Sequence, residues 1–142
     1  MTQDTIPNIM RKHHYLIEGV LNRLKRHEDD KAEIPKIFDK FKWELEKHFF
    51  IEEKAIFTLI DTDDQESHEM KLELIKEHRT ILKDMKNMEE KLKSEQSLDI
   101  SSFEHTLMKH RDFEDERFYP TLEEELPEDK KKEIIDRISN PI

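Results

Sequence analysis

The sequence predicts an all-α protein, folded as an antiparallel up-down-up-down four-helix bundle with a short C-terminal helix. Charged residues make up 42% of the 142 residues and hydrophobic residues 34%, with a single glycine at Gly19. This composition suits long solvated helices with narrow buried faces better than a sheet. Apolar residues recur three and four positions apart, which marks a buried face on each helix. The polar stretches between these patterns span roughly five to seven residues, so successive helices are expected to reverse direction.

The first two predicted helices each carry one stripe of residues at helical spacing. In the first helix the stripe contains Met10, His14, Ile17, Leu21 and Leu24. After the polar stretch 27–33, the stripe of the second helix contains Ile34, Phe38, Phe41, Leu45, His48, Glu52, Ile56 and Leu59. The polar segment 61–64 is expected to end the second helix.

Two more stripes and a short apolar segment complete the chain. The third stripe contains Leu74, His78, Ile81, Met85, Met88 and Leu92. The fourth contains Phe103, Leu107, His110, Glu114, Phe118 and Leu122, and either Ser97 or Asp99 is expected to cap its helix. After Pro127, three isoleucines on one side predict a short helix that closes the end of the bundle, at Ile134, Ile135 and Ile138.

The chain is expected to form a single domain over residues 1–142, with the bundle at about 8–126 and the short helix at about 127–139. No cysteine is present, so disulfides and thiolate metal sites are excluded. The amino terminus lacks a secretory pattern and no apolar run could span a bilayer, so a cytoplasmic protein without membrane contacts is expected. A formal charge of −10 disfavours nucleic acid as a partner.

The two halves of the sequence resemble each other. His14 in the first helix has a counterpart in His78 of the third, and segment 48–57 of the second helix has a counterpart in segment 110–119 of the fourth. This repeat predicts that one helical hairpin occurs twice, with the two copies related by a pseudo-twofold axis.

Six stripe positions hold a histidine or a glutamate where an apolar residue is expected. They are His14, His48, Glu52, His78, His110 and Glu114. Each glutamate lies four positions after a histidine, so the two side chains of such a pair share one helix face. Burying an unpaired imidazole or carboxylate costs several kcal/mol, and a bound metal would remove that cost.

Two metal ions fit this set better than one. Four imidazoles and two carboxylates exceed what a tetrahedral zinc needs, whereas two glutamates can bridge a pair of six-coordinate ions with two histidines on each. On that count about four of twelve coordination positions would stay free for a bridging oxygen species and exogenous ligands. The sequence therefore predicts an open two-metal centre.

Other histidines and acidic residues near the six are expected to lie outside the site. His13, His27, His68 and His105 lie in polar stretches or off the stripes. Glu53 and Asp115 follow the chosen glutamates and would face solvent in a regular helix. A widened π-type turn could bring Asp115 inward, however, which makes it the rival to Glu114 as a metal ligand.

From about Met10 to Leu126 the chain resembles the hemerythrin-like family, also described as His-His-Glu (HHE) cation-binding domains. The resemblance rests on His14, His78, and the two His-x-x-x-Glu pairs that begin at His48 and His110. It implies a non-heme di-iron site in an antiparallel bundle, with two iron ions (Fe²⁺/Fe³⁺) joined by carboxylates and an oxo or hydroxo bridge. Manganese and zinc also accept these ligands.

One departure from that family affects the expected function. Oxygen-carrying hemerythrins have a His-x-x-x-His pair on the third helix, but Leu74 occupies the position four before His78. The resemblance therefore favours a protein that binds O₂, nitric oxide or peroxide for sensing, scavenging or iron handling. The alternatives are a peroxidase-like or nitric-oxide-handling enzyme and a metal-free helical interaction protein, and a separate protein partner could contact the acidic surface.

Overall fold

The structure is a computed structural model that describes residues 4–60 and 65–140, so the expected loop 61–64 lies outside the described residues. All regular elements within those two ranges are helical, which confirms the all-α class. None of the described helices is long and apolar enough to cross a membrane.

Four long helices account for most of the described chain. They are α1 (Ile6–Arg26), α2 (Ile34–Ile51), α3 (Gln65–Lys93) and α4 (Ile100–Phe113). Shorter elements follow α2 and α4: the π-helical turn η1 (Glu52–Ile56), the 3₁₀ turn η2 (Phe57–Leu59), the π-helical turn η3 (Glu114–Phe118), α5 (Tyr119–Glu125) and α6 (Glu128–Ser139). The expected C-terminal helix therefore corresponds to α6.

Local sequence signals explain where several helices begin and end. The side chain of Thr5 accepts a hydrogen bond from the backbone of Asn8 and caps α1. Asp99, one of the two expected caps, accepts a hydrogen bond from the backbone N–H of Ser102 at 3.1 Å and begins α4. At the end of α3 the backbone of Glu95 has φ 57°, a left-handed conformation that glycine adopts at lower cost.

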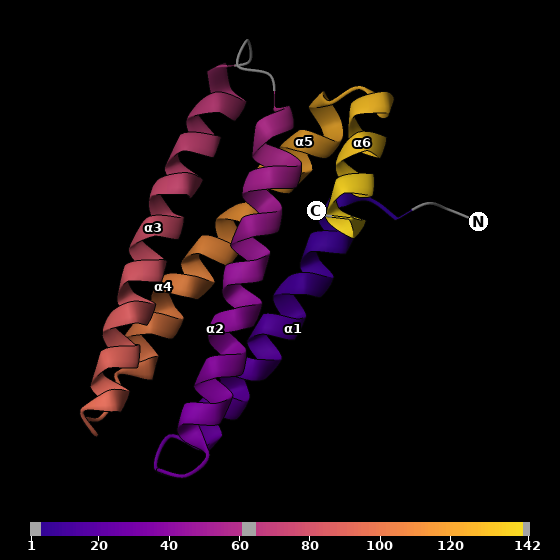
Figure 1. The fold of residues 1–142 in the computed structure, drawn as a ribbon. Coiled ribbons are helices and arrows are strands. Elements are labelled where there is room, and N and C mark those ends of the chain that lie inside the picture. Colours follow the sequence, from indigo (N-terminus) through magenta and orange to yellow (C-terminus); the bar gives the residue numbers. More distant parts are fainter. Residues whose placement is uncertain (1–3, 61–64, 141–142) are drawn as a thin grey trace.

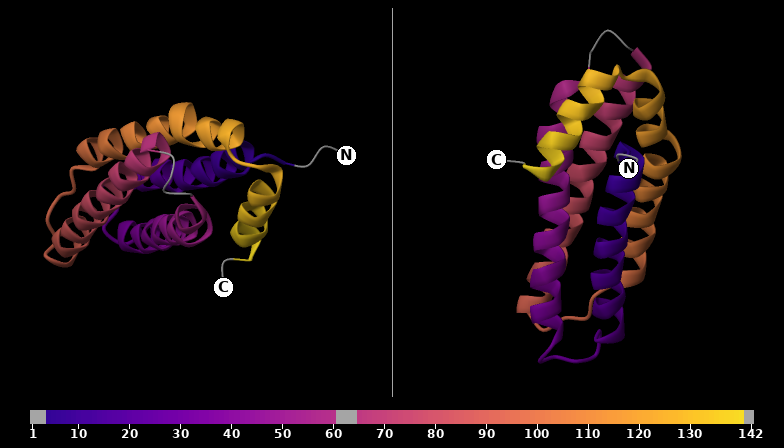
Figure 2. Two further views of the ribbon diagram at one scale, coloured as in Figure 1. Left: turned by 90° about the horizontal axis from the view of Figure 1, so that it is seen from above. Right: turned by 90° about the vertical axis from the view of Figure 1, so that its right-hand side faces the viewer.

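The four long helices lie lengthwise beside one another (Figures 1 and 2). Helix α1 packs against α2 and α4, and α3 packs against the same two helices. In Figure 1, α5 extends from the upper end of α4 and is followed by α6, which packs against η1 and α1. Ile134 and Ile138 are the buried residues of α6.

The core consists of two apolar clusters. One contains Leu24, Phe41 and Phe103 and occupies the half of the helices near the α1–α2 connection. The other contains Met10, Leu74 and Phe118, together with the buried isoleucines of α6. All six polar residues of the stripes lie between these clusters along the helices and are buried, so the interior contains one polar layer between two apolar layers.

The second and fourth stripes contain a feature that the expected regular helices lack. Each passes through a π-helical turn, and the turn begins at a stripe glutamate, Glu52 in η1 and Glu114 in η3. A π turn adds one residue to a helical turn and shifts the buried face that follows. In accord with this shift, Phe57 and Tyr119, five residues after the glutamates, are buried.

Candidate metal centre

The six polar stripe residues come from all four long helices and meet in the interior. Relative exposures are 0% for both glutamates and at most 5% for the histidines. Helices α1 and α3 contribute one histidine each, whereas α2 and α4 each contribute a histidine followed by the glutamate that begins a π turn. The structure therefore brings together every residue that the sequence predicted for the site: His14, His48, Glu52, His78, His110 and Glu114.

Glu52 faces two histidines through one carboxylate oxygen. Its Oε1 lies 2.9 Å from Nε2 of His48 and 3.4 Å from Nε2 of His78. Its second oxygen, Oε2, accepts a hydrogen bond of 2.5 Å from the hydroxyl of Tyr119. The two oxygens of Glu52 therefore have different surroundings.

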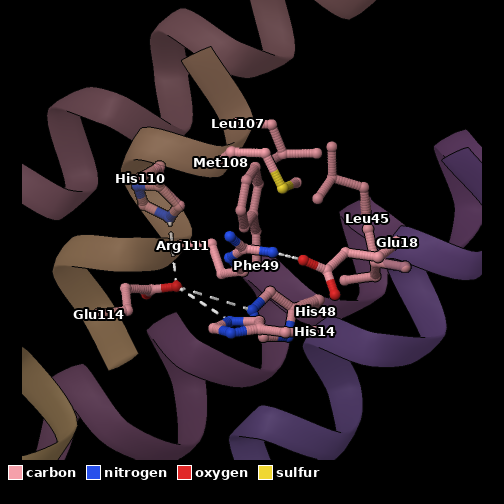
Figure 3. A pocket seen from close by; sticks show the side chains of 11 residues that line it. His14, Glu18, Leu45, His48, Phe49, Leu107, Met108, His110, Arg111 and Glu114 are labelled. Atoms are coloured by element: carbon pink, nitrogen blue, oxygen red, sulfur yellow. Dashed lines mark ion pairs between the residues drawn. The ribbon is translucent and has the colours of Figure 1, made fainter. Parts of the chain in front are cut away.

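Glu114 faces three histidines, also through one oxygen. Its Oε1 lies 3.2 Å from Nε2 of His14, 3.4 Å from Nε2 of His110 and 4.0 Å from Nε2 of His48 (Figure 3). Its Oε2 is buried and has no hydrogen-bond partner among the described residues. Asp115 does not replace it, so the π turn leaves Glu114 in the interior.

The donor atoms of this cluster fit a bound cation. Within residues 4–60 and 65–140, Nε2 of all four histidines, Oε1 of Glu52 and both oxygens of Glu114 are buried without a hydrogen-bond partner of good geometry. Buried polar atoms are normally satisfied, and a metal ion would satisfy imidazole nitrogens and carboxylate oxygens together. The buried His/Glu cluster can therefore hold metal cations.

Two overlapping groups of donors lie close enough to share an ion. One consists of Glu52, His78, His110 and Glu114, and the other of His14, His48 and Glu114, with the donor atoms in each group within 4.8 Å of one another. Glu114 belongs to both groups. The first group has four protein donors and the second has three, so two ions in these positions would have unequal protein coordination.

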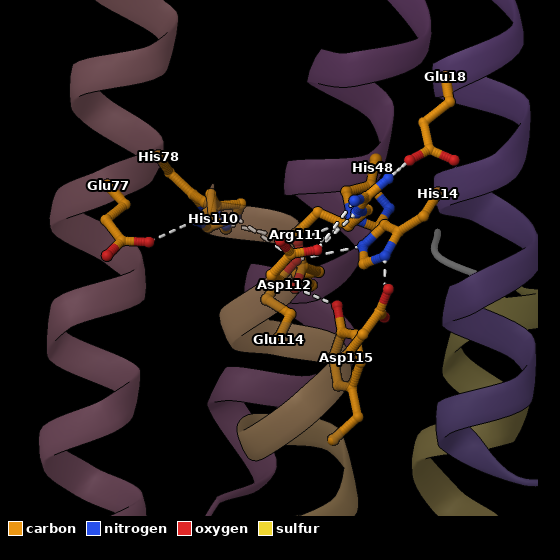
Figure 4. A network of polar contacts seen from close by, with 12 residues as sticks. His14, Glu18, His48, Glu77, His78, His110, Arg111, Asp112, Glu114 and Asp115 are labelled. Atoms are coloured by element: carbon orange, nitrogen blue, oxygen red, sulfur yellow. Dashed lines mark hydrogen bonds and ion pairs between the residues drawn. The ribbon is translucent and has the colours of Figure 1, made fainter. Parts of the chain in front are cut away.

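Three of the four imidazoles have a carboxylate near their outer nitrogen, and Figure 4 shows two of these carboxylates, Glu77 and Asp115. The Nδ1 atom of His110 is hydrogen-bonded to Oε1 of Glu77 at 2.7 Å. The Nδ1 atom of His14 lies 3.0 Å from Oδ1 of Asp115, and that of His78 lies 3.8 Å from Oε1 of Glu53. Such outer carboxylates orient imidazoles and make them better metal ligands.

The imidazoles and carboxylates of the cluster shift one another's pKa values. Burial alone lowers the pKa of His14 and of His78, but carboxylates outweigh it and raise each pKa to about 10: Asp115 and Glu114 beside His14, and Glu52 and Glu53 beside His78. Burial raises the pKa of Glu52, yet His48 and neighbouring groups bring it well below its usual value. The imidazoles and the Glu52 carboxylate therefore favour one another's charged forms.

A small cavity of about 20 Å³ adjoins the cluster, and its lining includes His14, His48, His110 and Glu114. Its walls are mostly apolar, with Leu45, Phe49 and Leu107 among them, and an ion pair between Arg111 and Glu18 joins α4 to α1 at its edge (Figure 3). A space of this size holds about one water molecule. The cavity therefore suits a very small molecule.

The remaining histidines lie outside the cluster. His105 is exposed, and His13, His27 and His68 are half-buried. His13 lies closest, with its ring centroid 5.8 Å from that of His48. Burial, and then the charges of His48 and His14, lower the pKa of His13 to about 4, so it is neutral at pH 7.

Sequence reasoning missed three outer residues and Tyr119. Asp115 and Glu53 were expected to face solvent, but Asp115 is only 18% exposed and both lie near an imidazole of the cluster. Glu77 was not assigned a role, although it immediately precedes His78. The sequence assigns Tyr119 no role, and the signal that could have found it is its position in the internal repeat, where the other half has Phe57.

Comparison with protein families gives one match. A family model described as the hemerythrin HHE cation binding domain matches residues 5–122, which include all six residues of the cluster. The chain matches no curated protein and no solved structure.

Proposed function

This chain belongs to the hemerythrin HHE cation-binding family, and from that premise we propose that it binds two iron ions and takes up O₂, nitric oxide or peroxide at them. The proposed ligands are His14, His48, Glu52, His78, His110 and Glu114. We further infer that residues 1–142 form one domain and that its long helices form the antiparallel four-helix bundle expected from the sequence.

The observation that carries this proposal is the convergence of seven buried donor atoms without a hydrogen bond of good geometry among the described residues: four imidazole nitrogens, one oxygen of Glu52 and two of Glu114. Without a cation, two carboxylates at 0% exposure need several buried imidazolium ions as counter-charges. Two divalent ions would supply the same positive charge at fixed positions. The mixed nitrogen and oxygen donors suit iron, and they also suit manganese and zinc.

The residues around the centre would have different roles in metal binding. Glu114 would be shared by the two ions, while Glu52 would belong chiefly to the group that contains His78 and His110. Bound iron would supply reversible redox chemistry and vacant coordination positions. The chain itself would orient the imidazoles, exclude bulk water and limit the size of the incoming molecule through the cavity beside His14 and His48.

The presence of Leu74, where oxygen carriers have a histidine, supports a function other than oxygen carriage. Leu74 is completely buried and belongs to the apolar cluster next to the site, so it offers no donor where an oxygen carrier has a fifth histidine. An ion in the group that contains His78 would therefore have a coordination position that no residue at 74 fills. We expect small ligands to reach either ion rather than one alone.

Anaerobic loading with Fe²⁺ followed by absorption spectroscopy tests this function. Spectra are recorded before and after separate additions of air, hydrogen peroxide and nitric oxide. A sensing or storage protein should give a stable adduct, whereas an enzyme should consume peroxide or nitric oxide repeatedly when a reductant is supplied. No spectral response to any of the three by the iron-loaded protein would contradict the proposal.

Adjacent glutamates provide a matched control for the ligand assignment. Glu52→Ala should abolish paired metal binding, because Glu52 is buried between His48 and His78. Glu53→Ala should retain two ions, because Glu53 is 42% exposed and lies near only the outer nitrogen of His78. Loss of paired binding in Glu53→Ala alone would show that the assigned helix register is wrong.

A further inference from the structure

Tyr119 breaks the symmetry between the two halves of the centre. It lies nine residues after His110, as Phe57 lies nine residues after His48. Each follows a π turn that begins at a stripe glutamate, and each is buried. Phe57 stacks on His78 with ring centroids 5.7 Å apart, and Tyr119 approaches His14 at 5.9 Å. The two positions therefore differ by one hydroxyl group, and only the fourth-helix position has it.

The hydroxyl of Tyr119 contacts the centre directly. It donates to Oε2 of Glu52 at 2.5 Å, while Oε1 of the same carboxylate faces His48 and His78. Glu114 also lies near this hydroxyl, but its Oε2 makes no hydrogen bond of good geometry within the described residues. One carboxylate is thus held through one oxygen, and the other has both oxygens available.

Packing alone does not account for a tyrosine at this position. Tyr119 is 0% exposed and belongs to an apolar cluster, where burying a hydroxyl carries a cost unless it finds a partner. Phenylalanine fills the equivalent position in the other half without that cost. The hydroxyl therefore has a specific use, and the atom it contacts is an oxygen of a proposed metal ligand.

We propose that Tyr119 is a positioning residue that holds Oε2 of Glu52, so that Glu52 offers only Oε1 to metal while Glu114 offers both oxygens. This inference rests on the proposed metal-binding function. The two carboxylates would then play different roles: Glu114 would have both oxygens available to metal, and Glu52 would have one. The resulting centre is asymmetric even though the sequence repeat is nearly symmetric.

Tyr119→Phe tests the proposal, with Tyr15→Phe as the control because Tyr15 is 64% exposed and the chain has only these two tyrosines. Anaerobic Fe²⁺ binding should weaken by about 10- to 100-fold in Tyr119→Phe, the range for loss of an outer partner of a metal ligand. The infrared separation between the two carboxylate stretches should also narrow, because a released Glu52 can bind through both oxygens. Tyr15→Phe should change neither quantity.

Two results would overturn this role. Unchanged Fe²⁺ affinity and an unchanged infrared spectrum in Tyr119→Phe would show that the hydroxyl positions nothing. A visible charge-transfer band in the ferric protein that disappears in Tyr119→Phe would show that Tyr119 binds iron as phenolate, which cannot donate a hydrogen bond. If wild-type protein itself fails to bind two ions, the proposed function fails instead.

Urea denaturation of the protein without metal tests the contact between Tyr119 and Glu52 separately from metal binding. Tyr119→Phe should lower the urea midpoint of metal-free protein, and the shift should be smaller in a Glu52→Leu background, where the acceptor is absent. Equal shifts in the two backgrounds would overturn the Tyr119–Glu52 contact whether or not iron binds. Circular dichroism of each variant checks that the helices are retained.

Discussion

Replacing Glu114 by glutamine, with Asp115→Asn as its neighbour control, should distinguish the two candidate carboxylates of the fourth helix. Glu114 is completely buried, and its Oε1 lies within 3.4 Å of imidazole nitrogens of both His14 and His110. Asp115 is 18% exposed and lies 3.0 Å from the outer nitrogen of His14. The two residues are adjacent in sequence, yet they face opposite sides of the same imidazole.

The expected magnitudes follow from those positions. Glu114→Gln removes a charge that belongs to both donor groups, and loss of one partner in a buried charge pair costs about 3–5 kcal/mol, or roughly 10²- to 10⁴-fold in affinity. Asp115→Asn removes only an outer partner, which weakens metal binding by about 10- to 100-fold. Glu114→Gln should therefore lose the paired ions, whereas Asp115→Asn should keep both at saturating metal.

Anaerobic titration with Fe²⁺, followed by metal analysis after removal of free ions, measures both quantities. Circular dichroism confirms that each variant remains helical. The opposite ranking would refute this reasoning: if Asp115→Asn loses the paired ions and Glu114→Gln retains them, the π turn places the metal ligand at Asp115.

Three further predictions concern stability. Between pH 6.5 and about 10, the metal-free protein should lose unfolding free energy, because the raised pKa values of His14 and His78 stabilise the fold only while these groups hold protons. Urea denaturation should show that the free energy of unfolding falls by up to about 1.4 kcal/mol per pH unit for each proton released. A free energy of unfolding that stays constant or rises over this pH range would contradict the prediction. Chelation should lower the melting temperature of metal-loaded protein, since ions at 1,000 times their Kd stabilise by about 4 kcal/mol; an unchanged temperature after verified metal removal would disprove this linkage. Glu95→Gly should raise the free energy of unfolding by about 1 kcal/mol, because Glu95 has φ 57°, and a decrease in urea denaturation would oppose that explanation.

The sequence pattern alone predicted that the six polar stripe residues are buried and lie close together. Burial at His14 or His78 follows from helical spacing, because the residues four positions before and three positions after each histidine are apolar core residues, Met10 and Ile17 or Leu74 and Ile81. The same periodicity predicted the all-α class and the C-terminal helix with Ile134 and Ile138. Periodic patterns suffice here because each residue's face depends chiefly on its own helix.

The π turns and their consequences could not be obtained from that periodicity. A regular helix from His110 places Glu114 and Phe118 on the buried face, but it leaves Tyr119 one position too late. The extra residue in η3 moves Tyr119 inward, where its hydroxyl meets Glu52 of another helix. Whether a π turn forms depends on packing and on contacts between helices, which single-helix spacing does not encode.

The carboxylates near the outer imidazole nitrogens could not be predicted from the sequence for a related reason. Glu77 lies on α3 but hydrogen-bonds His110 on α4, and Asp115 follows η3's first residue but approaches His14 on α1. These partners are set by the neighbouring helix rather than by position along one stripe. Acidic residues are abundant in this chain, so their identity alone did not distinguish them from solvated surface.

Counting iron per chain after anaerobic loading and removal of free ions tests the central claim most directly. The proposed centre predicts two ions per chain in the wild-type protein, and loss of paired binding in Glu52→Ala while Glu53→Ala retains it. Substantially fewer than two ions in well-folded wild-type protein, or the same count in all three proteins, would contradict a two-metal centre held by the buried histidines and glutamates.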